Sequence, residues 1–138
     1  AGAYQMSKHA METFTATMAQ ELAPAGVQVS VVEPGSYKSD IVRSTATRSG
    51  TLTQKDVDDW AKLLEPDDVA VAVEMALFEP TPKRRYMVVP SENQAEATIK
   101  AQIEQLVQLN EGQRYTYDRA KLIKMLDAAL KSARPRVK

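Results

Sequence analysis

The stretch "VQVSVVEPG", residues 27–35, is the segment from which the fold of this chain is read. It is short, contains four valines and has no charge before Glu33, a composition typical of a strand buried on both faces of a parallel sheet. Pro34 and Gly35 follow it, and this pair is typical of a sharp turn. We therefore predict a buried strand over residues 27–32 that ends in a turn.

The segments on either side of this strand alternate between helical and extended patterns. Apolar residues recur every four positions between residues 4 and 22, which predicts a helix that Pro24 and Gly26 end. After the turn, residues 36–64 are polar and mixed, and we predict a long loop with a short helix over 57–64. A helix is expected to begin at Pro66 and to end before Pro80. A strand is then expected over residues 86–89 and two amphipathic helices over 91–138, the second capped by Asp118.

This order of elements predicts an α/β fold. Strands that alternate with helices indicate a parallel sheet, but two strands alone cannot form a stable one. We therefore expect residues 1–90 to be the C-terminal half of a doubly wound parallel-sheet domain, and residues 91–138 to be a helical C-terminal extension. The first residue is alanine, so we expect the natural chain to begin upstream.

Composition narrows the classes of function. The 138 residues suffice for one domain, and the formal net charge of zero predicts neither a nucleic-acid partner nor an acidic membrane. The absence of cysteine excludes disulfides and thiolate chemistry, and the single histidine, His9, excludes a multi-histidine metal site. No apolar run is long enough to span a bilayer and no signal-peptide pattern is present, so we expect a cytoplasmic location. The basic runs at 83–85 and 134–138 are interpreted as a solvated turn and a solvated tail.

A second motif, "AYQMSKHAM" at residues 3–11, places Tyr4 and Lys8 one helical turn apart. Both side chains are common on surfaces, so this spacing taken alone is compatible with chance. A free tyrosine, however, has a pKa of about 10, too high for easy proton exchange at neutral pH. An ammonium group close to a phenol favours the phenolate. Residues i and i+4 share a helix face, so Tyr4 and Lys8 can act at one site.

The two motifs together resemble the C-terminal half of a classical short-chain dehydrogenase/reductase. In that family Y-x-x-x-K opens the long helix after the fifth strand, and the sixth strand ends in P-G, often within P-G-x-x-x-T. Here Tyr4-x-x-x-Lys8 is followed about thirty residues later by the valine-rich strand and Pro34-Gly35, with Ser39 four residues beyond the glycine. The resemblance covers residues 1 to about 90.

The resemblance implies a Rossmann-like fold, NAD or NADP as cofactor, and a small alcohol or carbonyl substrate. It implies that Tyr4 is the proton donor or acceptor and that Lys8 holds the ribose hydroxyls of the cofactor and supports the phenolate. The backbone from Pro34 through Gly35 and Ser36 to Tyr37 would hold the nicotinamide carboxamide, with Ser39 in the place of the usual threonine. Residues 36–64 would form the substrate lid. The intact protein would be a homodimer or homotetramer.

The chain also departs from the family pattern. Only three residues precede Tyr4, so the family's catalytic serine, its helix-four asparagine and its glycine-rich cofactor loop are absent from this sequence. Glu33 stands where asparagine is frequent, and we interpret this as tolerated variation. The residues that would distinguish NAD from NADP are missing, and the substrate is not specified. Trp60 is equally compatible with covering an apolar substrate and with closing a core.

Two functions of different classes remain open from the sequence. One is an NAD(P)-dependent oxidoreductase of which this chain is a fragment. The other is a truncated, non-enzymatic relative that serves as a binding or scaffold module.

Overall fold

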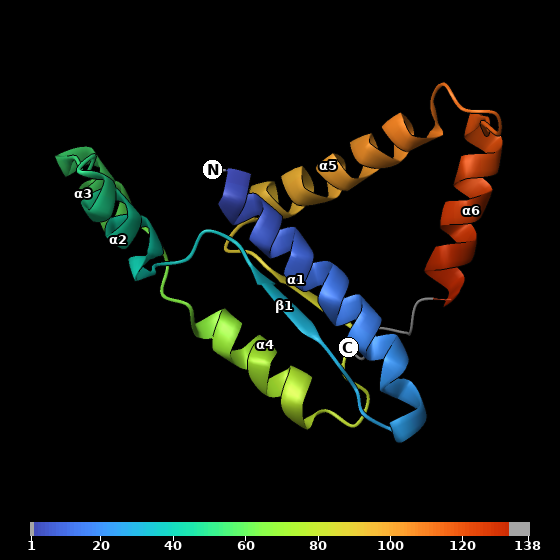
Figure 1. Cartoon of the computed structure of the whole chain (residues 1–138), viewed down its shortest axis with the longest axis horizontal. Helices are drawn as coiled ribbons and strands as arrows, with labels where there is room; N and C mark the ends of the chain where they lie inside the picture. Colours follow the sequence, from blue (N-terminus) through green and yellow to red (C-terminus); the bar gives the residue numbers. More distant parts are fainter. Residues whose placement is uncertain (1, 133–138) are drawn as a thin grey trace. The chain divides into compact units, whose positions relative to one another are not determined.

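The computed structural model describes residues 2–132, with the backbone alone at positions 42, 43, 45 and 46. The chain divides into two compact units, Ala1–Ala95 and Glu96–Lys138. In chain order the elements are α1 (Gly2–Glu21), the 3-10 turn η1 (Ala23–Ala25), β1 (Val31–Pro34), α2 (Asp40–Ser49), α3 (Gln54–Ala61), α4 (Asp67–Phe78), β2 (Arg85–Val88), α5 (Glu92–Asn110) and α6 (Arg119–Ser132). Figure 1 shows these elements along the chain.

The strands β1 and β2 form a parallel sheet in the first unit. Val31 lies opposite Arg85 and Pro34 lies opposite Val88, so the two carboxyl ends meet at one edge of the sheet. The predicted α/β class is confirmed, as is its parallel sheet, and the arrangement is consistent with part of a Rossmann-like fold.

The predicted bounds of both strands are wrong in detail. Residues 27–30 are not in a strand, and β1 begins only at Val31, where pairing with β2 starts. Val27 is 47% exposed, so the expected burial on both faces does not hold there. The second strand begins at Arg85 instead of Tyr86. Strand bounds depend on where a partner runs alongside, and the valine pattern does not contain that information.

One face of the sheet packs against α4, which contacts both strands. Tyr86 is 4% exposed and Ala72 on α4 is 5% exposed, and they belong to the small buried core of the described chain. The Tyr86 hydroxyl accepts a hydrogen bond of 2.9 Å from the N–H of Lys83, so its one polar group is satisfied inside the core.

An ion-pair network lies at Arg85, the first residue of β2. Its Nε lies 2.9 Å from a carboxylate oxygen of Glu33 on β1, and its terminal nitrogen lies 2.7 Å from Glu12 on α1. Hydrogen bonds to Glu33 and then to Glu12 raise the pKa of the Arg85 guanidinium above its ordinary value. Arg85 thus joins three elements, and its interpretation as part of a solvated turn is wrong. Glu33 is the strand's partner for this cation.

The segment after the turn is more ordered than the sequence pattern predicted. Residues 40–49, expected as loop, form α2, with Asp40 in its first turn, Arg48 in its last, and Gly50 at φ +66° directly after it. These charges complement the helix dipole, and a glycine with positive φ is a common helix end. The next helix, α3, begins after Thr53, which forms a capping box with Asp56. It ends at Ala61, three residues before the predicted end.

The second unit contains most of α5 and all of α6. The Asp118 carboxylate accepts a hydrogen bond of 2.8 Å from the Lys121 N–H, which confirms its predicted role as the N-cap of α6. In the connecting loop the Asn110 side chain bonds both the N–H and the carbonyl oxygen of Tyr117, each at 2.9 Å. Among residues 2–132 no helix combines the length and the apolar content that a membrane span requires.

Candidate active site

Tyr4 and Lys8 lie in the first turns of α1, as the sequence pattern predicted. The Lys8 ammonium nitrogen is 5.3 Å from the centroid of the Tyr4 ring. Ser7, between them, donates a hydrogen bond of 2.7 Å to the Tyr4 carbonyl oxygen, so its hydroxyl is engaged with the helix backbone. Tyr4 is 50% exposed. The pair therefore combines a phenol and an ammonium on one accessible helix face.

The turn at Pro34 and Gly35 is held by backbone hydrogen bonds at the carboxyl edge of the sheet. The Gly35 N–H donates to the Val88 carbonyl oxygen at 2.7 Å, and the Tyr37 N–H donates to the Gly35 carbonyl oxygen at 3.0 Å. The Ser36 N–H donates to the Gln94 side-chain oxygen at 3.1 Å. Three consecutive N–H groups of the turn are thus bonded within the chain. In open α/β sheets this edge, outside the carboxyl ends of the strands, is where ligands bind.

Gly35 is required for the close packing of this turn. A Cβ at this position would lie 2.7 Å from the Gln94 side-chain oxygen, 2.9 Å from a Val89 methyl carbon and 3.3 Å from Pro90 Cδ. The first two distances are shorter than real Cβ contacts, so a side chain here would force its neighbours to move. Gln94, Val89 and Pro90 were not among the predicted site residues, and their positions follow from β2 running alongside β1.

The side chain of Tyr37 has a structural role. It is 6% exposed, and its hydroxyl donates a hydrogen bond of 3.3 Å to the Asp68 carboxylate in the first turn of α4. Burial, followed by the negative charge of Asp68 and the hydrogen bond to it, raises the pKa of the Tyr37 phenol. Any contribution of Tyr37 to a ligand site would therefore come from its backbone, which is the role that the resemblance implied.

The residues that follow tie the end of the turn to the segment around α3. The Lys38 N–H donates to the Leu64 carbonyl oxygen at 2.8 Å, and the Lys38 ammonium is 2.7 Å from Glu65. Trp60 donates its ring N–H to the Ser39 carbonyl oxygen at 2.9 Å, and Lys38 lies 4.9 Å from the centroid of the Trp60 ring. Ser39 is exposed. Trp60 thus anchors α3 to this loop.

The two predicted groups of site residues lie toward the same end of the first unit. In Figure 1 α1 and β1 run in opposite directions, so the N-terminal turns of α1 and the carboxyl end of β1 point the same way. Tyr4 and Lys8 come from the helix, and Pro34 to Ser39 come from the loop that follows the strand. The described residues contain no group of three or more His, Asp or Glu side chains placed to hold a metal ion.

The chain is similar to known dehydrogenases. The short chain dehydrogenase family model matches residues 1–50. Dehydrogenase/reductase SDR family protein 7-like of Drosophila melanogaster is 31% identical over 80 residues, which are 58% of this chain and 24% of the relative. The uncharacterized oxidoreductase YbbO of Escherichia coli K12 is 34% identical over 91 residues, 63% of this chain and 33% of the relative. Retinol dehydrogenase 5 of Mus musculus is 38% identical over 48 residues, 35% of this chain and 15% of the relative. No solved structure matches the chain.

In these three relatives the chain spans between 15% and 33% of the length. The segment that the family model matches contains α1 with Tyr4 and Lys8, β1, the turn at Pro34 and Gly35, and α2. This segment, which carries both motifs, is similar to the short chain dehydrogenase family.

Proposed function

We propose that the protein is an NAD(P)-dependent oxidoreductase that interconverts an alcohol and a carbonyl compound. The observation that carries the proposal is the pair Tyr4 and Lys8, which share one exposed face of α1 within the family-matched segment. The names of the relatives, which are dehydrogenases or oxidoreductases, support the same class of reaction.

In this proposal each side of the site has one task. The bound nicotinamide supplies or accepts the hydride. Tyr4 gives its phenolic proton to the oxygen of a carbonyl substrate, or takes the hydroxyl proton of an alcohol. Lys8 holds ribose hydroxyls and favours the phenolate of Tyr4 by its positive charge. Proton transfer of this kind contributes about 10²- to 10⁴-fold to a rate.

The turn after β1 fits the orienting role. Because the N–H groups of Gly35, Ser36 and Tyr37 are bonded within the chain, the turn is ordered before a ligand arrives. A rigid surface is what holding a nicotinamide ring in one orientation requires. The bare Cα of Gly35 lets Gln94 pack closely on this turn. Ser39, exposed in the same loop, is proposed to contact the carboxamide.

We further propose that residues 36–64, with α2 and α3, form the lid over the substrate. The two ends of this segment are bonded to each other, Lys38 to Glu65 and Trp60 to Ser39, and in this proposal α2 and α3 move as a unit. Closure of such a segment would exclude water from the reacting centre.

A homodimer or homotetramer also remains a proposal. It is supported by α1, on which Met6, Met11 and Phe14 are between 61% and 73% exposed. Large apolar side chains on one element are an unfavourable surface in water unless a second surface covers them.

The function is tested with variants of the intact protein. Tyr4→Phe should lower turnover at least 100-fold while nicotinamide binding, followed by fluorescence, stays close to that of the wild type. Lys8→Met should weaken nicotinamide binding and also slow the chemical step. Tyr115→Phe, at an exposed tyrosine of the second unit, is the control and should change neither. Near-normal turnover of Tyr4→Phe would remove Tyr4 from the mechanism, and a wild type that binds no nicotinamide would favour the non-enzymatic alternative.

A further inference from the structure

The charges of this chain are distributed very unevenly. Residues 119–138 contain seven of the eighteen lysines and arginines but only one of the eighteen acidic residues, Asp127. The preceding 118 residues therefore carry an excess of acidic groups, and the net charge of zero is the sum of two opposite regions. Such asymmetry is typical of chains with one basic segment that binds an anionic partner.

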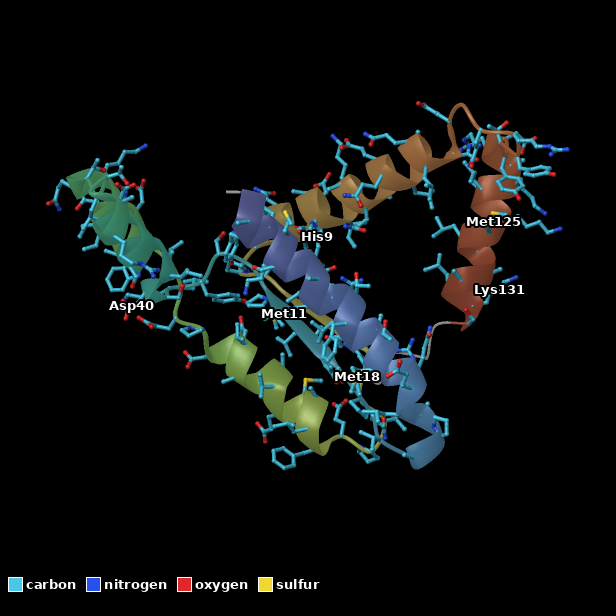
Figure 2. All side chains as sticks on the ribbon, viewed as in Figure 1. His9, Met11, Met18, Asp40, Met125 and Lys131 are labelled. Carbon is cyan, nitrogen blue, oxygen red and sulfur yellow. The ribbon has the colours of Figure 1, made fainter. Side chains whose placement is uncertain are left out.

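The described part of the basic region is α6, and its side chains are sorted onto two faces. Leu122, Ile123, Leu126 and Leu130 follow the i, i+1, i+4, i+8 spacing of one helix face, and Lys121, Lys124 and Lys131 lie on the other. Figure 2, in which Met125 and Lys131 are labelled, shows nitrogen-tipped side chains on one side of α6 and carbon-only side chains on the other.

The apolar face of α6 is open. Ile123 is 38% exposed, Leu126 58% and Leu130 64%. Its cations are exposed as well. The helix therefore presents a strip of leucine and isoleucine together with an excess of positive charge. The strip requires an apolar surface on a partner, and the positive charge requires an anionic one. A hydrophobic helix partner would satisfy the strip only, whereas an anionic lipid surface satisfies both.

We propose that α6 binds the surface of an anionic lipid bilayer and lies in the plane of its headgroups. The leucine face would enter the boundary between headgroups and acyl chains, and the lysines would contact lipid phosphates. A helix of 14 residues is about 21 Å long, shorter than the roughly 30 Å hydrocarbon core, so α6 lies on the membrane instead of crossing it. The whole-chain charge predicted no membrane partner because it averages α6 with the acidic remainder.

The proposal is tested by sedimenting the intact protein with vesicles of phosphatidylcholine alone or with about one third phosphatidylglycerol, without nicotinamide. We expect binding to the anionic vesicles only, weakened by salt. Because a lysine near such a surface contributes about a fivefold change in affinity, Lys121→Gln with Lys124→Gln should weaken binding about 25-fold. Leu126→Gln with Leu130→Gln should also weaken it. Lys100→Gln on α5 is the matched control and should have no effect.

Charge-conserving variants separate a binding defect from a folding defect. Lys121→Arg with Lys124→Arg should keep the wild-type affinity, and circular dichroism should show the same helix content in every variant. Equal binding to neutral and anionic vesicles, no binding to either, or full binding by the double glutamine variant would each overturn the proposal. Burial of the α6 face in a second copy or another protein, seen as association without lipid that Leu126→Gln abolishes, would overturn it too. None of these outcomes depends on oxidoreductase activity.

Discussion

Replacing Gly35 with alanine should destabilise the protein through steric overlap at the carboxyl edge of the sheet. The added Cβ would lie 2.7 Å from the Gln94 side-chain oxygen and 2.9 Å from a Val89 methyl carbon. Gly35 is not one of the glycines with positive φ, which are Gly26, Gly50 and Gly112 among the described residues. The cost is therefore one of space and not of backbone conformation.

The expected loss in the free energy of unfolding follows from the two side chains that have to move, Gln94 and Val89. Displacing the end of Gln94 breaks its hydrogen bond from the Ser36 N–H, a loss of about 0.5–1.5 kcal/mol. Moving the stiff, β-branched side chain of Val89 is an overpacking cost of about 1–3 kcal/mol. We expect the free energy of unfolding to fall by about 2–4 kcal/mol, a large part of the 5–15 kcal/mol typical of a domain.

The assay is urea denaturation of the intact protein. Gly2→Ala is the control, since no atom lies within 4 Å of a Cβ at that position of α1 and alanine favours a helix. Gln94→Ala removes the atom nearest to the new methyl group, so the double variant should lose less stability than the sum of the two single changes. If Gly35→Ala unfolds within about 0.5 kcal/mol of the wild type, the tight packing of the turn is refuted.

Three further predictions concern the same unit. Folding raises the pKa of the Tyr37 phenol, so its stabilising contribution is complete below about pH 10 and is lost as the pH rises through the folded pKa. Tyr37→Phe should therefore flatten the fall of the melting temperature at alkaline pH. An unchanged fall would contradict this reasoning. Arg85→Ala should lower the free energy of unfolding by about 1 kcal/mol, since the ion-pair network is partly exposed. Urea denaturation should show a smaller loss for the control Arg84→Ala, and equal losses would argue against the network. Amide hydrogen exchange in residues 40–61 should slow when nicotinamide and substrate are both bound, and exchange that stays the same with and without them would remove the lid.

The sequence by itself determined the elements that depend only on residues close together in the chain. The helices α1, α4, α5 and α6 follow from apolar periodicity, and the start of α6 follows from the capping side chain of Asp118. The shared face of Tyr4 and Lys8 follows from helix geometry alone, because residues four apart always lie one turn apart. The helix α2 was missed although its signals are also local, because the low helix propensity of its serine and threonine residues outweighed them.

The tertiary structure decided everything that depends on residues far apart in the chain. The strand begins at Val31 and not at Val27 because β2, more than fifty residues later, pairs only from there. Other contacts also join residues far apart in the sequence: Ser36 bonds Gln94, Tyr37 bonds Asp68, and Arg85 bonds Glu12. Glu33 was interpreted from the sequence only as tolerated variation, whereas in the structure it pairs with a cation. Which cation it would be depended on the register of the two strands, and periodicity along one chain segment carries no information about register.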